Sequence, residues 1–243
     1  MPRVRWLLMF EKVDLENTAT PARSAATLIV TRDGATGLEV LLLRRNPALK
    51  VMAGAWVFPG GKVDADDHGD DALSRANSAA IRELHEETGL EVGSEPIVHF
   101  SRWLTPEVVK HRFDTYFFLA PQSGNASVVV DGSEIVEYRW VKPNDAVVEQ
   151  AAGKLKLPPP TLVSLIDVAE HEGLTDLVKA VMRRQPPYFF PRIVEHGEDH
   201  VFLYPGDSGY ETSDVGHVAT RHRTTMHQGV FSYRRDFAWP DRH

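Results

Sequence analysis

The stretch that decides the fold is residues 54–90, GAWVFPGGKVDADDHGDDALSRANSAAIRELHEETGL. It begins as a short apolar run that ends in a tight turn, Phe-Pro-Gly-Gly, at residues 58–61. It ends in residues 82–90, whose periodicity is typical of the last turns of a helix. Gly89 follows the last periodic residue, at a position where a left-handed C-cap is favoured. The sequence therefore predicts a strand, a glycine turn, a long loop and a helix.

The predicted helix carries an unusual concentration of negative charge on one side. At about 100° per residue, Glu83, Glu86 and Glu87 fall within a single arc of about 100°. Like charges at i,i+3 and i,i+4 cost about 0.2–0.5 kcal/mol per pair, and only Arg82 and Glu86 form an obvious helical ion pair. Hard divalent cations take oxygen ligands and would relieve this repulsion. A solvated acidic face is the alternative.

The helix and the turn together resemble the Nudix box, G-x5-E-x7-R-E-U-x-E-E-x-G-U, in which U is a bulky aliphatic residue. Residues 82–90 match the second half at every position. Gly61 precedes Arg82 by 21 positions, against 14 in the pattern, so the loop carries seven extra residues and Ser74 takes the slot of the first Glu. Five aspartates are alternatives for that Glu, and the sequence does not choose among them: Asp64, Asp66, Asp67, Asp70 and Asp71.

The resemblance implies a metal-dependent hydrolase of a nucleoside diphosphate linked to another moiety, in an α/β fold. The fold it implies is the Nudix α/β/α sandwich with a mixed sheet. The implied ligands for Mg²⁺ or Mn²⁺ are Glu83, Glu86, Glu87 and the Gly61 carbonyl. The implied catalytic set is Glu83, Glu86, Glu87, Arg82 and Glu134. In that set Arg82 orients the acids, and Glu83 or Glu134 is the general base. Glu137 is an alternative to Glu134, and either glutamate could instead be a solvated strand residue.

A second resemblance concerns residues 41–61, LLLRRNPALKVMAGAWVFPGG. They are similar to the motif that precedes the box in Nudix hydrolases that cleave coenzyme A, with departures at Leu43, Asn46 and Lys50. With the lengthened loop, they resemble the peroxisomal type of these enzymes. The implied substrate-binding residues are Arg45, Lys50, Phe58, Gly60, Gly61, Trp103, Arg112 and Tyr116. Ordinary loop charges are the alternative for Arg45 and Lys50, and core packing is expected for Phe113, Phe117 and Phe118. Coenzyme A or acyl-CoA is one candidate substrate, and NDP-sugars, NADH, diadenosine polyphosphates and ADP-ribose are the others.

The composition excludes several other classes of function. The formal net charge of −7 argues against binding to nucleic acid or to an anionic membrane, both of which need positive patches. The chain has no cysteine, which excludes disulfides, thiolate zinc sites and cysteine nucleophiles. No apolar run approaches the roughly 18 residues of a membrane span. A cytoplasmic location and a small-molecule substrate are therefore expected.

The chain is expected to contain an N-terminal arm (1–22), a Nudix domain (23–185) and a C-terminal β-rich extension (186–243). Strands are predicted at residues 25–32, 39–45, 55–58, 112–120, 128–130 and 133–141. A helix is predicted from Asn144 or Asp145 as N-cap, and helical pattern continues over residues 160–184 with a break at Gly173. The extension reads as two hairpins, over residues 190–204 and 221–235, with scattered surface histidines. It is expected to cover the substrate cleft or to form the arm of a homodimer.

Two other classes of function remain open at this point. One is a Nudix-like nucleotide-binding or regulatory module that has lost catalysis. The other is a structural domain in which the acidic face is merely solvated. Intact glutamates at positions 83, 86 and 87 argue against the first of these.

Overall fold

The computed structural model describes residues 20–122 and 127–242 of the 243-residue chain. The helices are α1 (Ala72–Thr88), α2 (Pro143–Ala151), α3 (Pro159–Val168) and α4 (Leu174–Arg183). The strands are β1 (Arg23–Gly34), β2 (Gly37–Arg45), β3 (Trp56–Val57), β4 (Gly60–Lys62), β5 (Val98–Leu104), β6 (Phe113–Pro121), β7 (Ile135–Val141), β8 (Tyr188–Phe189), β9 (Arg192–His196), β10 (Asp199–Leu203), β11 (His222–His227) and β12 (Val230–Arg235). Within the described ranges, no helix is long and apolar enough to span a membrane.

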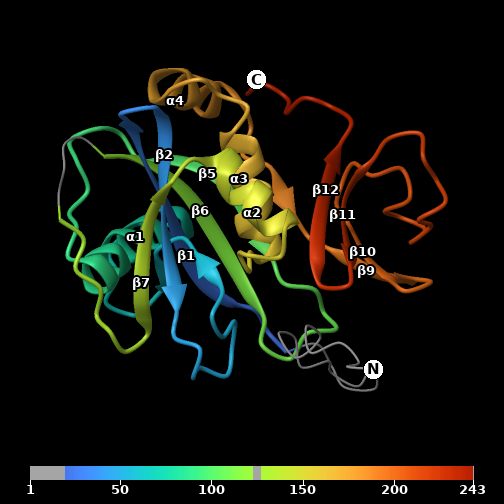
Figure 1. The fold of residues 1–243 in the computed structure, drawn as a ribbon, viewed down its shortest axis with the longest axis horizontal. Coiled ribbons are helices and arrows are strands. Elements are labelled where there is room, and N and C mark those ends of the chain that lie inside the picture. The colour runs from blue at the N-terminus through green and yellow to red at the C-terminus, as the bar shows by residue number, and fades with distance from the viewer. Residues whose placement is uncertain (1–19, 123–126, 243) are drawn as a thin grey trace.

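The larger sheet is mixed, as predicted. Its main order is β3-β2-β1-β6-β5-β8, and in addition β4 pairs with β1 and β7 pairs with β2. The β1–β6 and β5–β8 pairs are parallel, whereas the other pairs are antiparallel. Strand β1 lies between β2 and β6 inside this sheet (Figure 1). It also pairs with β4, the strand that contains Gly60 and Gly61 of the glycine turn.

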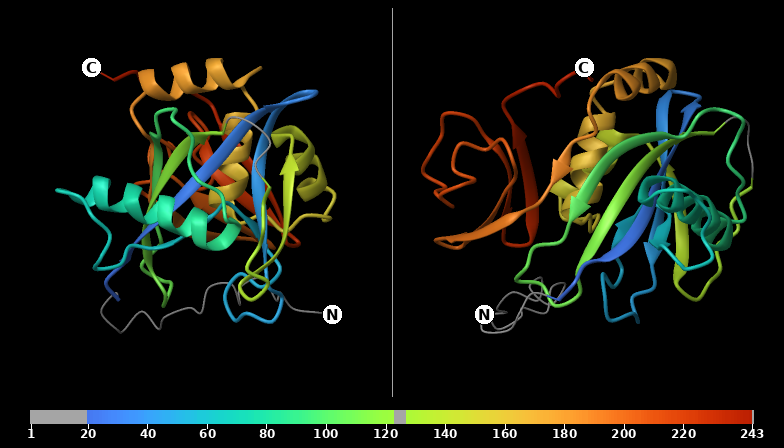
Figure 2. Two further views of the ribbon diagram at one scale, coloured as in Figure 1. Left: turned by 90° about the vertical axis from the view of Figure 1, so that its left-hand side faces the viewer. Right: turned by 180° about the vertical axis from the view of Figure 1, so that it is seen from behind.

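Helices cover both faces of the larger sheet. Helix α1 lies on one face, where Ala76, Ala79, Ala80 and Leu84 pack against β1, β2 and β6. Helices α2, α3 and α4 cover the opposite face, as the two views of Figure 2 show. This arrangement confirms the predicted α/β/α sandwich.

Most predicted elements are present, but the structure differs at several places before residue 160. Strands β4 and β5 were not among the predicted strands. Residues 128–130 form no strand. Helix α2 begins two or three residues earlier than expected, with Lys142 as N-cap and Pro143 at the first helical position. Because the fixed φ of proline suits that position, the helix starts without a side-chain cap, and Asn144 and Asp145 lie inside its first turn. Residues 1–19 of the expected N-terminal arm lie outside the described residues.

The C-terminal strands form a separate antiparallel sheet in the order β12-β11-β10-β9, which confirms both predicted hairpins. It stands beyond α2 and α3 (Figure 1). Phe202 and Phe231 from this sheet, together with Tyr204 just after β10, enter the same apolar core as residues of α3 and β5. The second sheet therefore packs against the helical layer.

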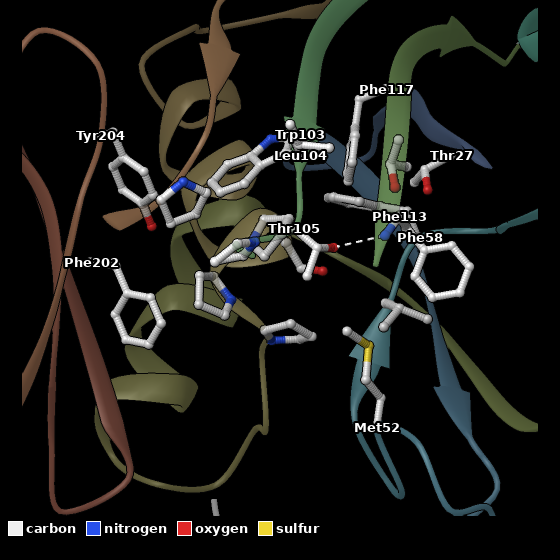
Figure 3. A pocket seen from close by; sticks show the side chains of 18 of the residues that line it. Thr27, Met52, Phe58, Trp103, Leu104, Thr105, Phe113, Phe117, Phe202 and Tyr204 are labelled. Carbon is white, nitrogen blue, oxygen red and sulfur yellow. Dashed lines mark hydrogen bonds between the residues drawn. The ribbon is translucent and has the colours of Figure 1, made fainter. Parts of the chain in front are cut away.

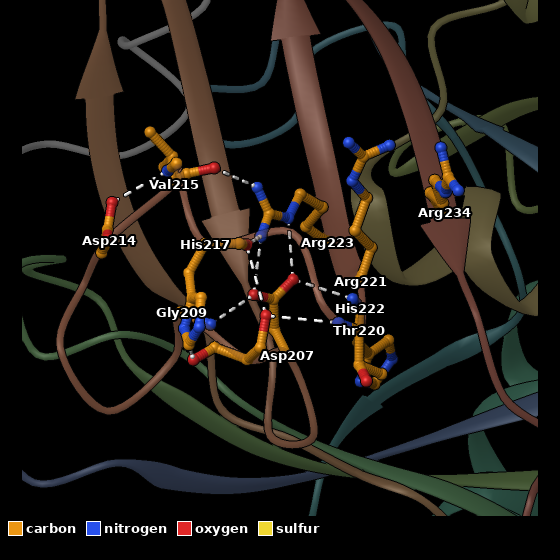
Figure 4. Close-up of polar contacts among 12 residues, drawn as sticks. Asp207, Gly209, Asp214, Val215, His217, Thr220, Arg221, His222, Arg223 and Arg234 are labelled. Atoms are coloured by element: carbon orange, nitrogen blue, oxygen red, sulfur yellow. Dashed lines mark hydrogen bonds and ion pairs between the residues drawn. The ribbon is translucent and has the colours of Figure 1, made fainter.

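The loop between β10 and β11 is organised around one buried carboxylate, Asp207 (Figure 4). Asp207 accepts hydrogen bonds from the backbone N–H groups of Gly209 (2.9 Å) and His222 (2.8 Å). It also pairs in a bidentate manner with Arg223, at 2.7 Å through both Nε and Nη2. Arg223 donates onward to the carbonyl of Val215. A single ion pair thus fixes the loop to the sheet.

The expectation that the histidines of the extension all lie on the surface is wrong for His222. This side chain is 1% exposed and lies among Phe189, Tyr204 and Trp239. Its Nδ1 lies 2.6 Å from the carbonyl oxygen of Pro205. The hairpin pattern correctly places His222 on a strand, but a strand alternates its faces and the pattern alone does not say which face is buried.

We expect His222 to make folding sensitive to acid. Burial lowers its pKa from 6.5 to about 4. Between these values only the unfolded chain binds the proton, so stability rises with pH across this window and is lost as the pH falls. The shift corresponds to about 3 kcal/mol. The variant His222→Asn keeps an N–H near Pro205 and should flatten the profile between pH 4 and 6.5, measured by urea unfolding. The exposed His196→Asn is the control, and an unchanged slope in His222→Asn contradicts the assignment.

Candidate active site

The turn at residues 58–61 lies where two elements approach too closely for side chains. Gly60 pairs with Thr27 of β1 and has a φ of +156°, and a Cβ there would lie 2.4 Å from the Ala26 carbonyl oxygen. At Gly61 a Cβ would lie 2.2 Å from Oε1 of Glu83. The backbone therefore requires glycine at position 60, whereas at position 61 a side chain would displace the Glu83 carboxylate of the acidic helix.

Helix α1 is defined by caps at both ends. Asp71 is the N-cap, and its side chain accepts from the N–H of Ser74 at 2.7 Å while the Ser74 hydroxyl meets the Asp71 N–H, which makes a capping box. Ser74 therefore serves the start of the helix, in the slot where the Nudix pattern has Glu. At the other end Gly89 has a φ of 67° and donates to the His85 carbonyl, as predicted. These caps fix where the helix begins and where it ends.

The three glutamates of α1 occupy different environments. Glu87 is 8% exposed and accepts a hydrogen bond of 2.9 Å from the Gly60 N–H. Glu83 is half-buried against Gly61 and lies 3.0 Å from Arg82. Glu86 is exposed and lies 3.1 Å from Arg82, which confirms the predicted i,i+4 ion pair. The structure thus brings two of the acids against the glycine turn and leaves the third at the surface.

Burial dominates the electrostatics of the two inner carboxylates. It raises the pKa of Glu87 to about 8. The hydrogen bond from Gly60 lowers this pKa, and the negative charges of Glu83 and Glu134 raise it further. Burial also raises the pKa of Glu83, although Arg82 opposes the shift. Two partly desolvated carboxylates side by side form a site that favours an additional positive charge.

Arg82 connects the acidic helix to the long loop, and its partner there is Asp67. Nε and Nη2 of Arg82 each lie 3.0 Å from one oxygen of Asp67, and Nη2 also donates to the Lys62 carbonyl. These bonds hold the pKa of Asp67 below its usual value. Asp67 is buried, whereas Asp64 is exposed and its carboxylate lies farther from Arg82, at 3.6 Å. Asp67 is therefore the loop acid that pairs with the arginine of the box, which the sequence did not identify.

Loss of the Asp67 carboxylate should release Arg82 from the loop and let the acids shift. We expect Asp67→Asn to lower kcat/KM by about 10- to 100-fold, the usual effect of removing a group that orients ligands. Asp66→Asn, an exposed neighbour in the same loop, is the matched control. The measurement is pyrophosphate hydrolysis by both variants. Equal rates in the two variants would show that Asp67 has no orienting role.

A cavity of about 500 Å³ opens on the other side of the glycine turn. Gly60 and Gly61 line it, and so do Phe58, Arg45 and Arg112. Arg23, Lys62 and Lys110 add positive charge to its wall, and Glu134 adds a carboxylate that lies 2.8 Å from Arg45. Basic side chains from four separate segments therefore surround a cavity whose wall is backed by the carboxylates of α1. Sequence reasoning missed Arg23, Lys62 and Lys110, because only the fold brings them together.

Three of the predicted substrate-binding residues lie away from this cavity. Lys50 is exposed on the loop after β2 and is not among the lining residues. Tyr116 packs on the α1 side of the sheet, with the Arg102 guanidinium 4.8 Å from its ring. Trp103 is 5% exposed and stacks on Phe189 at 3.9 Å, although its edge lines a separate apolar pocket. Of the three phenylalanines expected in the core, Phe117 and Phe118 are buried, whereas Phe113 is half-buried and lines the cavity.

No group of three or more Asp, Glu or His side chains within residues 20–122 and 127–242 converges as a ready set of metal ligands. Glu83 and Glu86 turn toward Arg82, and Glu87 turns toward Gly60. The donor chemistry nonetheless fits a hard divalent cation, because the carboxylates of half-buried Glu83 and buried Glu87 repel each other and both have raised pKa values. The Gly61 backbone lies directly against Glu83.

Comparison with known proteins agrees with this geometry. A family model described as NUDIX domain matches residues 21–160. The acyl-coenzyme A diphosphatase of Xenopus laevis is 27% identical over 81% of this chain and 83% of its own length, and that of Homo sapiens is 34% identical over 48% and 32%. A crystal structure of a Nudix hydrolase from Alicyclobacillus acidocaldarius covers 65% of this chain and 96% of its own, with a TM-score of 0.60 and 24% identity. The chain therefore belongs to the Nudix family, as a hydrolase that acts on pyrophosphate bonds.

Proposed function

We propose that this hydrolase cleaves the pyrophosphate of coenzyme A or an acyl-CoA with the help of Mg²⁺ or Mn²⁺. The products of coenzyme A would be 4′-phosphopantetheine and adenosine 3′,5′-bisphosphate. The observation that carries the proposal is the Gly60–Glu87 hydrogen bond, because it joins the acidic helix to a turn that lines the basic cavity. The names of the Xenopus laevis and Homo sapiens relatives support this choice of substrate.

The charges of the cavity suit a substrate that carries several phosphates. Arg45 and Arg112 line it, and guanidinium groups bind phosphate oxygens through paired hydrogen bonds. Arg112 already donates to the carbonyls of Thr105 and Thr20, so its side chain is held in place before substrate binds. We assign Arg45, Arg112 and Lys62 to the phosphates of the substrate.

Glu83, Glu86 and Glu87 would hold the divalent cation, with the Gly61 carbonyl as a further ligand. A cation bound there would supply charge neutralisation for the pyrophosphate and would activate a water molecule. Arg82 positions these acids through its contacts with Glu83, Glu86 and Asp67. Among the two candidates for the general base, Glu134 is favoured over Glu83 because it lies in the cavity wall. A general base must reach the attacking water within hydrogen-bond distance.

A substrate panel tests the proposal. The purified full chain is incubated with Mg²⁺ or Mn²⁺ and with coenzyme A, acetyl-CoA, an NDP-sugar, NADH, diadenosine tetraphosphate and ADP-ribose, and the products are identified by mass spectrometry. We expect adenosine 3′,5′-bisphosphate from coenzyme A or its thioester, at the highest kcat/KM of the panel. Preference for another member of the panel overturns the choice of substrate. If no member of the panel is cleaved, the proposed hydrolysis is wrong and the alternative of a nucleotide-binding module without catalysis is favoured.

A further inference from the structure

A second, apolar pocket lies between the Nudix fold and the C-terminal sheet (Figure 3). Its volume is about 200 Å³. Phe58 and Thr27 form the wall on the larger sheet, and Phe202 and Tyr204 form the wall on the C-terminal side. Pro158–Pro160 at the start of α3 close it from a third side. The pocket exists only because the C-terminal sheet packs against the α/β/α sandwich.

The lining of this pocket is hydrocarbon with few polar groups. None of the described residues that line it is charged. The hydroxyl of Tyr204 is engaged with Thr224 at 2.7 Å, and the Thr105 hydroxyl accepts from the Phe113 N–H at 3.1 Å. A ligand group placed here would therefore meet mainly methyl, methylene and aromatic surface.

The apolar pocket adjoins the basic cavity. The two share a set of lining residues, Thr27, Met52, Val57, Phe58, Phe113 and Thr115. A substrate whose phosphates lie beside Arg45 and Gly61 therefore has the apolar pocket next to it, with Phe58 in the lining of both. One molecule with a charged part and a long apolar part fits both compartments.

We propose that the apolar pocket binds the acyl chain of a CoA thioester, so that the C-terminal sheet determines the substrate preference of the enzyme. This inference rests on the proposed pyrophosphate hydrolysis. A nucleobase or a sugar fits less well, because its polar atoms would lose their hydrogen bonds to water and find few partners. A hydrocarbon chain loses nothing and gains the free energy of leaving water.

The first test is a chain-length series of straight acyl-CoA thioesters against unacylated coenzyme A. We expect kcat/KM to rise by about three- to fourfold for each methylene that enters the pocket, and to stop rising when the pocket is full. Equal kcat/KM for coenzyme A and all its thioesters overturns the inference while the hydrolase function stands. Absence of turnover on any pyrophosphate overturns the proposed function itself.

The second test fills the pocket from the C-terminal side. Ile193 lines the pocket, whereas its neighbour Val194 packs on the other side of the same strand with Val201 and Leu203. Ile193→Trp should lower the ratio of kcat/KM for an acyl-CoA to that for coenzyme A by at least about tenfold, since it removes room for several methylenes. Val194→Trp should keep the ratio of the wild type. A ratio unchanged in Ile193→Trp means that the pocket holds a part common to both substrates, and contradicts the proposal.

If Ile193→Trp does not fold, enlarging the pocket gives an independent result. Phe202 lines the pocket and Val201 on the same strand does not. Phe202→Ala should move the chain length with the highest kcat/KM to longer acyl groups, and Val201→Ala should leave it in place. No movement in Phe202→Ala overturns the assignment of the pocket to the acyl chain.

Discussion

Replacement of Glu87 by Gln is expected to lower kcat/KM for pyrophosphate hydrolysis by about 10²–10³-fold, the typical loss when one group that stabilises developing charge is removed. The amide oxygen of Gln can still accept the Gly60 N–H, so the glycine turn should keep its shape. What is lost is the negative charge beside Glu83, on which cation binding depends in our proposal. Steady-state rates with Mg²⁺ measure the effect.

The stability of Glu87→Gln separates this loss of charge from a loss of structure. The folded pKa of Glu87, about 8, lies above the ordinary glutamate value of 4.5, so its contribution to stability is present below pH 4.5 and is lost as the pH rises through 8. Without metal, the variant should therefore be at least as stable as the wild type at pH 9. Glu91→Gln, exposed just after the helix, is the control. Wild-type activity in Glu87→Gln would contradict the assignment of Glu87 as a ligand of the cation.

Replacement of Asp207 by Ala is expected to destabilise the fold by about 3–5 kcal/mol, because it leaves the buried Arg223 without its counter-charge. The backbone N–H groups of Gly209 and His222 lose their acceptor in the same step. Equilibrium unfolding in urea measures the change. Since Tyr204 lies in the same segment, we also expect the acyl-chain preference to weaken in this variant.

Asp214→Ala is the matched control for Asp207. Asp214 lies in the same loop, is exposed, and accepts a hydrogen bond from the Gly216 N–H at 2.9 Å. It should cost less than about 1 kcal/mol, because its side chain remains solvated. Similar losses in both variants would show that the buried ion pair does not hold the loop to the sheet.

Local patterns in the sequence predicted many of the strands and much of the helix geometry, whereas the sandwich was implied by the resemblance of residues 54–90 to the Nudix box. The strands 25–32 and 39–45 alternate or run apolar, the turn between them contains two glycines, and Gly89 occupies its expected left-handed C-cap. Such features depend on residues that are close together in the chain, so the sequence alone can predict them. The predicted start of α2 was wrong, because the helix begins with a proline at its first position and has no side-chain cap.

The candidate site was less predictable, because it depends on contacts between distant segments. Five aspartates in the loop have the same local character, and only the position of the loop relative to α1 distinguishes Asp67 from the rest. Trp103 and Tyr116 lie on strands where the next residue faces the opposite side, so motif position alone could not say which one meets the cavity. The homodimer, the domain boundaries and the cytoplasmic location stay predictions.

The most direct test of the central claim is the rate of coenzyme A cleavage by the purified full chain, measured with Mg²⁺ or Mn²⁺ and again with the metal chelated, in the wild type and in Glu86→Gln. Our account predicts release of adenosine 3′,5′-bisphosphate only when metal is present, and a rate in Glu86→Gln lower by about 10²-fold or more. Metal-independent cleavage, or equal rates in the two proteins, would contradict the assignment of the α1 carboxylates as the catalytic metal site.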